Sequence, residues 1–131
     1  MRFLEMMRNG GEDVDGDRIL SPKTVELMTV DHLGEVEFRP GVGFGLGFEV
    51  VEDLGERGKL GSEGEYRWGG AYGTTYWIDP KEEMSVAFFM QLRPTGGLDA
   101  HEKLRASIYQ AIVESPCCGS TEDEEGEVVT D

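Results

Sequence analysis

Residues 66–80 read YRWGGAYGTTYWIDP, and this stretch decides the fold that the sequence predicts. Residues 66–68 and 74–78 are rich in aromatic and β-branched side chains, which favour strands. A turn is expected at 79–82, which reads DPKE. Residues 84–92 then present apolar side chains on both faces of the next strand. We therefore expect a β-hairpin in the middle of a sheet that is covered on both faces.

Helical patterns are expected before and after this sheet region. Residues 1–8 carry apolar side chains at helical spacing, and the glycines after Asn9 stop the helix. A second helix is predicted from an N-cap at Ser21 to about Leu33, because a proline follows at the first helical position. The last helix is expected to begin with Asp99 as its N-cap. Its predicted buried stripe comprises Ala100, Leu104, Ile108, Ala111 and Ile112.

Residues 42–50 show a strict two-residue alternation. Apolar side chains occupy one set of positions, and three glycines with Glu49 occupy the other. The pattern predicts a single strand, one face of which is nearly bare backbone. We interpret the glycines as room for another element to pack closely. They do not form a nucleotide-binding loop, because the G-x-G-x-x-G register fails.

Together these elements predict an α+β fold, in which an antiparallel sheet is covered by the C-terminal helix and preceded by short helices. We assign residues 1–114 to one domain and expect residues 115–131 to form an acidic, disordered tail. One helix cannot cover both faces of an apolar sheet. We therefore expect a partner, either the rest of the same protein or a second copy of this chain.

The charge of the chain is extreme. The sequence has 27 acidic and 12 basic residues, which gives a formal net charge of −15. Such a surface repels nucleic acid and anionic membranes, so neither is expected as a partner. No apolar run approaches the ~18 residues that a membrane span needs, and we expect a cytoplasmic protein. The acidity also suggests the hypothesis of a halophilic source.

The cysteines and histidines predict no cofactor and no metal site. Cys117 and Cys118 are adjacent, so they cannot link distant segments, and a reducing compartment is the simplest setting. The two histidines, His32 and His101, fall on separate predicted helices. Both are expected on solvated helix surfaces, His101 within reach of Arg105. Three aromatic side chains are expected in the core: Trp77, Phe88 and Phe89.

Three collinear segments resemble the class C β-lactamase and family VIII carboxylesterase group of serine hydrolases. They are residues 8–25, with RNGG and ILSPKTV, then 43–48, which read GFGLGF, and 66–80. The resemblance implies a partial β-lactamase or transpeptidase-like fold, as in penicillin-binding proteins. It also implies hydrolysis of esters or amides through an acyl-serine intermediate. The alternative is that residues 68–73 are only a strand whose small side chains let a helix pack closely.

The resemblance places the site residues between Trp68 and Tyr72. Trp68, Gly69 and Gly70 stand where the lactamases have Lys-Thr-Gly, so the cation that anchors a β-lactam carboxylate is missing. An ester or amide with an apolar acyl part is therefore the better substrate. The resemblance also implies that the backbone N–H of Ala71 is an oxyanion donor. Tyr72 lies at the expected edge of the cleft, where it lines the substrate pocket or simply packs.

The family's nucleophile is absent from the sequence. No serine is followed three residues later by lysine, and the only asparagine, Asn9, does not belong to a Tyr-x-Asn motif. We therefore expect the chain to be the C-terminal part of such a hydrolase, inactive until it is joined to an N-terminal portion with the nucleophile. The alternative is a non-catalytic binding or assembly module that self-associates through its sheet.

The acidity generates the first prediction, that salt stabilises the fold. At a net charge of −15 the compact state suffers self-repulsion, and at ~0.1 M salt the Debye length is still ~10 Å. The melting temperature should therefore rise between dilute buffer and about 2–3 M KCl, where screening is complete. Circular dichroism against temperature measures this. A melting temperature that stays constant or falls would contradict the halophile hypothesis.

Overall fold

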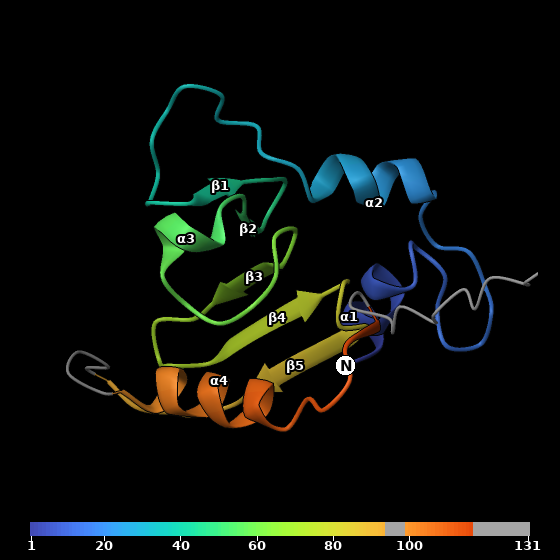
Figure 1. The fold of residues 1–131 in the computed structure, drawn as a ribbon. Helices are drawn as coiled ribbons and strands as arrows, with labels where there is room; N and C mark the ends of the chain where they lie inside the picture. Colours follow the sequence, from blue (N-terminus) through green and yellow to red (C-terminus); the bar gives the residue numbers. More distant parts are fainter. Residues whose placement is uncertain (94–98, 117–131) are drawn as a thin grey trace, which may run out of the picture.

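The computed structural model describes residues 1–93 and 99–116 and shows an α+β fold built on one antiparallel sheet (Figure 1). The sheet has the strand order β1-β2-β3-β4-β5, so each strand lies beside its neighbour in sequence. The expected fold class is therefore confirmed. The elements are α1 (Arg2–Arg8), α2 (Pro22–Met28), β1 (Val42–Phe44), β2 (Glu49–Val51), α3 (Leu54–Arg57), β3 (Tyr66–Gly69), β4 (Thr75–Asp79), β5 (Met84–Phe88) and α4 (Ala100–Gln110).

The pairing of β3 differs along its two edges. On one side β3 pairs with β4 along its whole length, from Tyr66 opposite Ile78 to Gly69 opposite Thr75. On the other side the ladder with β2 covers only two positions, and it ends where Arg67 lies opposite Glu49. The part of β3 beyond Arg67 therefore has one edge without a partner in β2. This edge leads directly into the β3–β4 turn.

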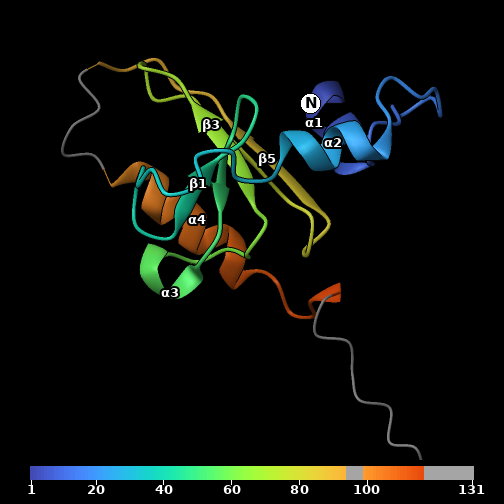
Figure 2. The same ribbon diagram turned by 90° about the horizontal axis from the view of Figure 1, so that it is seen from above.

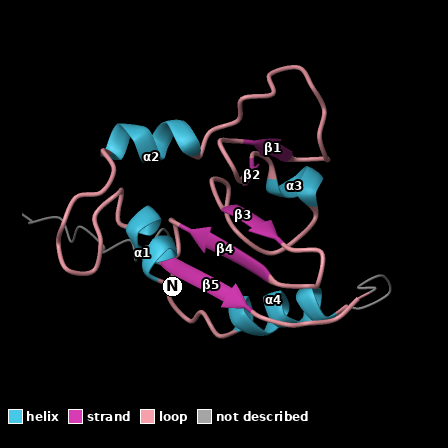
Figure 3. Cartoon of the chain, turned by 180° about the vertical axis from the view of Figure 1, so that it is seen from behind, coloured by secondary structure: helices cyan, strands magenta, loops and turns pink. Residues whose placement is uncertain are grey.

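The helices α1 and α2 lie on one face of the sheet, and α4 lies on the other (Figure 2). Side chains of α1, α2 and three strands form the apolar core on the first face, and Phe48 packs edge-on against Tyr66 at 5.2 Å between ring centroids. Figure 3 shows α1 beside β5 and β4, the strands that it contacts. The face that the sequence left without a cover is thus covered in part by α1 and α2. The core comprises Leu4, Met6, Met7, Val25, Phe48, Val50, Tyr66 and Ile78.

The face of α4 that meets the sheet is a polar one. His101, Arg105 and Tyr109 recur at four-residue spacing and all make contacts with the sheet or the segments beside it. Arg105 is only 5% exposed, and its guanidinium lies 4.4 Å from the centre of the Trp77 ring. The prediction that an apolar stripe of α4 is buried was therefore wrong, because the most buried residue of the helix is Arg105. Ala100, Leu104, Ile108 and Ile112 are only half-buried, and Ala111 is exposed.

Arg105 is buried because the sheet region beneath it presents a carboxylate. The side chain of Glu65 is fully buried and accepts hydrogen bonds from Arg105 Nη1 at 2.7 Å and Nη2 at 2.8 Å. Arg57 Nη2 donates to the same carboxylate at 3.0 Å, from a side chain that is 2% exposed. Tyr109 Oη lies 3.0 Å from Glu65 Oε2 and 2.8 Å from Asp79 Oδ2, which are both acceptors. These five residues form the ionic cluster beneath α4.

The titration of Glu65 reflects this cluster. Burial by itself raises the pKa of Glu65, but the hydrogen bonds and charge of Arg105, with the charge of Arg57, outweigh burial and hold the pKa below its ordinary value. Burial also raises the pKa of Tyr109, and the negative charge of Glu65 raises it further. At neutral pH the cluster therefore holds two charged guanidinium groups against ionised Glu65, with a phenol that donates a hydrogen bond.

The single strand predicted at 42–50 is two short strands. The chain reverses after β1, where Gly45 N–H donates to the Phe48 carbonyl at 2.8 Å and Gly47 has a φ of +96°. The prediction that glycine gives packing room was correct at Gly43 and Gly45. A Cβ at Gly43 would meet the side chain of Asp31, and one at Gly45 would meet the carbonyl of Met28 at 2.2 Å. The two-residue alternation of apolar side chains continues through the chain reversal, so this pattern could not distinguish one strand from two.

The second helix begins as predicted and ends earlier. Ser21 Oγ accepts from Thr24 N–H at 3.0 Å, and the proline sits at the start of α2. The helix stops at Met28, whose carbonyl accepts from Leu46 N–H at 2.9 Å instead of continuing the helix. The carboxylate of Asp31 accepts from three backbone N–H groups, those of Phe44, Leu33 and Gly34, and the first two lower its pKa the most.

The remaining sequence-based expectations had mixed outcomes. His32 is exposed as predicted, but it lies beyond the end of α2 and not on the helix, with Nε2 2.7 Å from the Leu27 carbonyl. Trp77 is 2% exposed and Phe88 is half-buried, but Phe89 is 77% exposed, so its prediction as a core residue was wrong. Asp99 precedes α4 without a side-chain capping bond. The short helix α3 was not predicted, and most of the predicted tail, residues 117–131, lies outside the described residues.

The ionic cluster generates a stability prediction. Replacing Glu65 by Gln should lower the free energy of unfolding by about 3–5 kcal/mol, because Arg57 and Arg105 stay buried without their counter-charge. Urea unfolding followed by circular dichroism measures this. The control is Glu12→Gln, which removes a salt bridge to Arg18 between side chains that are 45% and 48% exposed. That change should have an effect below about 1 kcal/mol.

The pH dependence of stability in wild type and in Glu65→Gln provides a second readout. The folded-state pKa of Glu65 lies below its ordinary value of 4.5, so its stabilising effect is present above that pH and is lost as the pH falls through the folded-state pKa. The stability difference between wild type and Glu65→Gln should therefore be constant at neutral pH and shrink in acid below pH 4.5. Equal losses in Glu65→Gln and in the control would contradict the role of the cluster.

Candidate functional site

The turn between β3 and β4 is tightly closed by its own backbone. Gly70 N–H donates to the Thr74 carbonyl at 2.8 Å, and Gly73 N–H donates to the Gly70 carbonyl at 3.0 Å. Gly73 has a φ of +90°, a conformation that favours glycine. From outside the turn, Leu92 N–H donates to the Tyr72 carbonyl at 3.0 Å. These contacts fix the course of the backbone around Ala71.

Ala71 lies at the exposed tip of this turn. Among the described residues, its backbone N–H makes no hydrogen bond. The turn follows the part of β3 whose outer edge has no partner in β2. A backbone N–H in this situation is free to donate to an incoming group. Such a donor is suited to a carbonyl oxygen on which negative charge develops during acyl transfer.

Trp68 and Tyr72 present aromatic surface beside the turn. Trp68 is 42% exposed and lies opposite Tyr76, on the face of the sheet away from α4. Its ring packs edge-on against Phe44 at 5.2 Å between centroids. Tyr72 is 47% exposed, and the guanidinium of Arg93 lies 5.8 Å from its ring centre. Both side chains can therefore contact an apolar group placed beside the turn.

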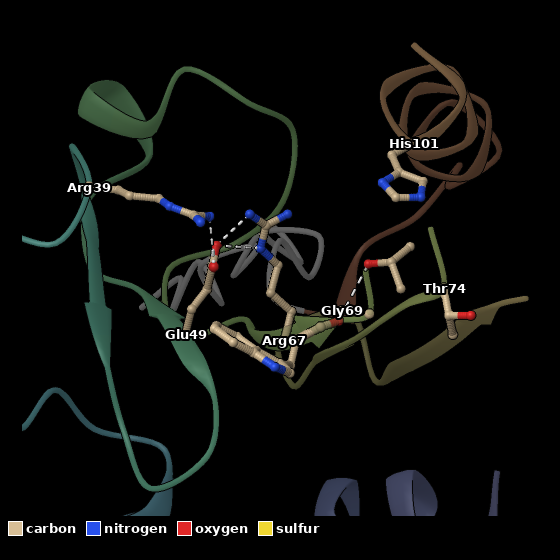
Figure 4. Close-up of a pocket in the computed structure, with 9 residues that line it drawn as sticks. Arg39, Glu49, Arg67, Gly69, Thr74 and His101 are labelled. Atoms are coloured by element: carbon tan, nitrogen blue, oxygen red, sulfur yellow. Dashed lines mark hydrogen bonds and ion pairs between the residues drawn. The ribbon is translucent and has the colours of Figure 1, made fainter. Parts of the chain in front are cut away.

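A cavity of about 270 Å³ lies behind the turn, on the α4 face of the sheet (Figure 4). At one end, Glu49 is 3% exposed and sits between two arginines. Arg39 Nη1 donates to Glu49 Oε2 at 2.9 Å, and Arg67 Nε donates to Oε1 at 2.7 Å. At the other end, the wall comprises the backbone of Gly69 and the side chain of His101. This charged triad supports the base of β3 below the turn.

His101 is not on a solvated surface, so the sequence-based prediction was wrong. The ring is half-buried, and its Nε2 lies 2.6 Å from the carbonyl oxygen of Gly73. It also packs edge-on against Phe88 at 6.0 Å between centroids. Figure 4 shows the ring extending from α4 toward the strands. The interaction with Arg105 that the sequence suggested is replaced by this contact with the turn.

The structure places the five residues singled out from the sequence, Trp68 to Tyr72, on the end of β3 and the turn that follows it. It also reveals four ionisable side chains around the cavity that the sequence did not assign to a site. They are Arg39, Glu49, Arg67 and His101. The sequence could have indicated only one of these contacts, the pairing of oppositely charged Glu49 and Arg67 on neighbouring strands β2 and β3. The interpretation of residues 42–50 as a single strand concealed this pairing.

Two further searches concern metals and membranes. Within residues 1–93 and 99–116, no group of three or more His, Cys, Asp or Glu side chains is arranged to hold a metal ion. None of the helices in this part of the chain combines the length and apolar character that crossing a bilayer requires.

Comparison with protein families identifies the fold. The sequence model of the family described as Beta-lactamase matches residues 1–110. The chain belongs to the beta-lactamase family. The collinear segments that suggested this relationship all lie within the matched range. As a beta-lactamase-like chain, it belongs with the serine hydrolases of that family.

Three similar proteins extend this result. The uncharacterized protein MT1414 of Mycobacterium tuberculosis strain CDC 1551 and protein Rv1367c of strain H37Rv are both 36% identical over 112 residues. Each match covers 76% of this chain and 28% of the relative. The solved structure of EstCE1, a hydrolase with promiscuous acyltransferase activity, superimposes with a TM-score of 0.65 at 29% identity. That match covers 81% of this chain and 27% of EstCE1, so the chain spans little more than a quarter of its relatives.

Proposed function

We propose that this chain supplies the oxyanion turn and the substrate-side strand of a serine hydrolase that cleaves esters or amides. The observation that carries the proposal is the backbone N–H of Ala71. Ala71 is an exposed residue, its N–H makes no hydrogen bond among the described residues, and it follows the Trp-Gly-Gly that stands in the family's Lys-Thr-Gly position. The hydrogen bonds of Gly70 and Gly73 hold this N–H in place before substrate arrives.

The proposed chemistry is acyl transfer through a serine. The hydroxyl of the nucleophile gives its proton to a base in the nucleophile-bearing portion and attacks the carbonyl carbon of the substrate, and the electron pair of the C=O bond moves to the oxygen. When that pair returns, the alcohol or amine leaves with the proton, and water later hydrolyses the acyl-serine. Ala71 N–H donates to the carbonyl oxygen most strongly when it carries negative charge. The interaction therefore stabilises the transition state more than the bound substrate, which is the condition for a faster chemical step.

The substrate class follows from Trp68. The side chain at this position is apolar and 42% exposed, where the lactamases have a lysine. A carboxylate next to an indole ring would lose hydration without gaining a cation. We therefore propose an ester or amide with an uncharged, apolar acyl part, with Trp68 and Tyr72 providing the apolar contact surface. The hydrolase character of EstCE1 is consistent with this choice.

The nucleophile is proposed to come from the rest of the hydrolase. The 131 residues contain neither Ser-x-x-Lys nor Tyr-x-Asn, so the chain by itself should have no hydrolase activity. The alternative role is a module that self-associates through a bare sheet face, and the arrangement of the helices argues against it. The helices α1 and α2 lie on the face that was expected to be bare, and their side chains belong to the core.

The proposal is tested with Ala71→Pro in the complete hydrolase, which includes the nucleophile-bearing portion. Proline has no N–H, so the oxyanion donor is deleted. We expect kcat for a p-nitrophenyl ester to fall by about 10²-fold or more, with a smaller change in KM. Thermal unfolding of the same variant checks that the turn still folds.

Two controls accompany this experiment. Ala71→Gly keeps the N–H and should retain kcat within a fewfold of the wild type. The 131-residue chain alone should neither hydrolyse the ester nor react with a fluorophosphonate probe. Full activity of a folded Ala71→Pro enzyme would show that the oxyanion strand is assigned wrongly. Labelling of the isolated chain would overturn the proposal that the nucleophile lies elsewhere.

Trp68 generates the prediction about specificity. In the complete hydrolase, Trp68→Lys should increase the ratio of penicillin turnover to ester turnover, because the ammonium provides a partner for the β-lactam carboxylate. Comparison of kcat/KM for a penicillin and a short p-nitrophenyl ester measures the ratio. Trp68→Leu, which changes the side chain without adding charge, is the matched control. A wild-type enzyme that already hydrolyses penicillins efficiently would contradict the proposed preference.

A further inference from the structure

The polar stripe of α4 connects the ionic cluster to the candidate oxyanion turn. His101, Arg105 and Tyr109 are spaced by four residues, so they lie on the same face of one helix. Arg105 and Tyr109 bind the buried carboxylates of Glu65 and Asp79, which fixes α4 along and around its axis. His101 lies one turn before Arg105. Its position over the sheet is therefore set by the same bonds that hold the helix.

The contact between His101 and Gly73 has a defined donor. The carbonyl of Gly73 can only accept, so the proton of the bond at 2.6 Å lies on His101 Nε2. Both the neutral ring protonated at Nε2 and the imidazolium meet this requirement. Phe88 packs against the ring edge-on and limits its rotation. His101 therefore donates a hydrogen bond to this one backbone carbonyl from a restrained position.

Gly73 links the hydrogen bond of His101 to the turn that contains the proposed oxyanion donor, Ala71 N–H. Its N–H closes the turn onto Gly70, and its carbonyl accepts from His101, so both polar groups of a buried glycine are bonded. Without His101 the Gly73 carbonyl would lose the partner that the structure provides, and the peptide between Gly73 and Thr74 could rotate toward other acceptors or donors. Ala71 lies between the two glycines that close the turn. Its N–H direction therefore depends on both.

We propose that His101 is a positioning residue that holds the β3–β4 turn from the α4 side, so that Ala71 N–H points toward the substrate carbonyl. It touches no reacting atom, and it acts through Gly73. The inference rests on the proposed function of Ala71 as an oxyanion donor and extends it to a residue on another element. It also gives a role to a histidine that no motif of the sequence singles out.

The first experiment measures the turn itself in the 131-residue chain. We compare the hydrogen exchange of the Gly70 and Gly73 amides by NMR in wild type, His101→Leu and His101→Gln. Leucine fills the space beside Phe88 but cannot donate, whereas the amide nitrogen of glutamine is as many bonds from Cα as His101 Nε2. Exchange of the two amides should accelerate about five- to tenfold in His101→Leu and return toward wild type in His101→Gln.

The matched control is His32→Leu, at the histidine that contacts the Leu27 carbonyl at the end of α2. This change should leave the exchange of the turn amides unchanged. The amides of Trp77 and Ile78, in the middle of the sheet, report whether the fold is kept in every variant. Unchanged exchange at Gly70 and Gly73 in a folded His101→Leu variant would overturn the proposal.

The second experiment measures catalysis in the complete hydrolase. His101→Leu should lower kcat for the ester by about ten- to a hundredfold with KM nearly unchanged, as expected for a misplaced oxyanion donor, and His101→Gln should restore most of it. A looser turn with an unchanged kcat would overturn the positioning role while leaving the proposed function intact. Full activity of Ala71→Pro would instead overturn the proposed function. The two failures are therefore distinguishable.

Discussion

The structure depends on one buried carboxylate. The side chain of Glu65 is fully buried, and Arg57, Arg105 and Tyr109 lie within hydrogen-bond distance of its two oxygens. A carboxylate in this position is stable only when it is paired, because the charge loses its hydration. The arginines come from α3 and α4, whereas Glu65 directly precedes β3. Ionic pairing therefore fixes two helices to the strand that carries the candidate site.

The space around this carboxylate is also restricted. Gly61 has a φ of +142°, and a Cβ there would lie 2.4 Å from Glu65 Oε2 and 2.8 Å from Arg57 Nη1. Larger side chains at this position would displace the carboxylate from its partners. A small change in the cluster would shift Arg105, and with it the first turn of α4 and His101. The geometry of the β3–β4 turn thus depends on contacts well away from Ala71.

The sequence predicted the parts of the fold that rest on local periodicity. The hairpin of β4 and β5, the Ser21 cap of α2 and the helix at 100–110 all follow from patterns within a few residues. The position of the hairpin was predicted wrongly, because it lies at an edge of the described sheet and not in its middle. The candidate turn was located differently, through the resemblance of residues 66–80 to a family motif. Pairings between distant residues were not predictable. A helix whose buried centre is Arg105 contradicts the rule that apolar residues face the sheet, and the rule fails here because Glu65 lies on the other side.

The two faces of the sheet are therefore held by different forces, and this difference bears on the acidic surface. The α1 face is an apolar core, which burial of methyl and aromatic groups stabilises. On the α4 face, the ion pairs of Glu65 join side chains that are at most 6% exposed. Salt screens exposed charges much more than buried ones. Added salt should thus relieve repulsion among the surface carboxylates without weakening the Glu65 cluster, so a highly acidic chain can use buried ion pairs to position the strand that carries the candidate site.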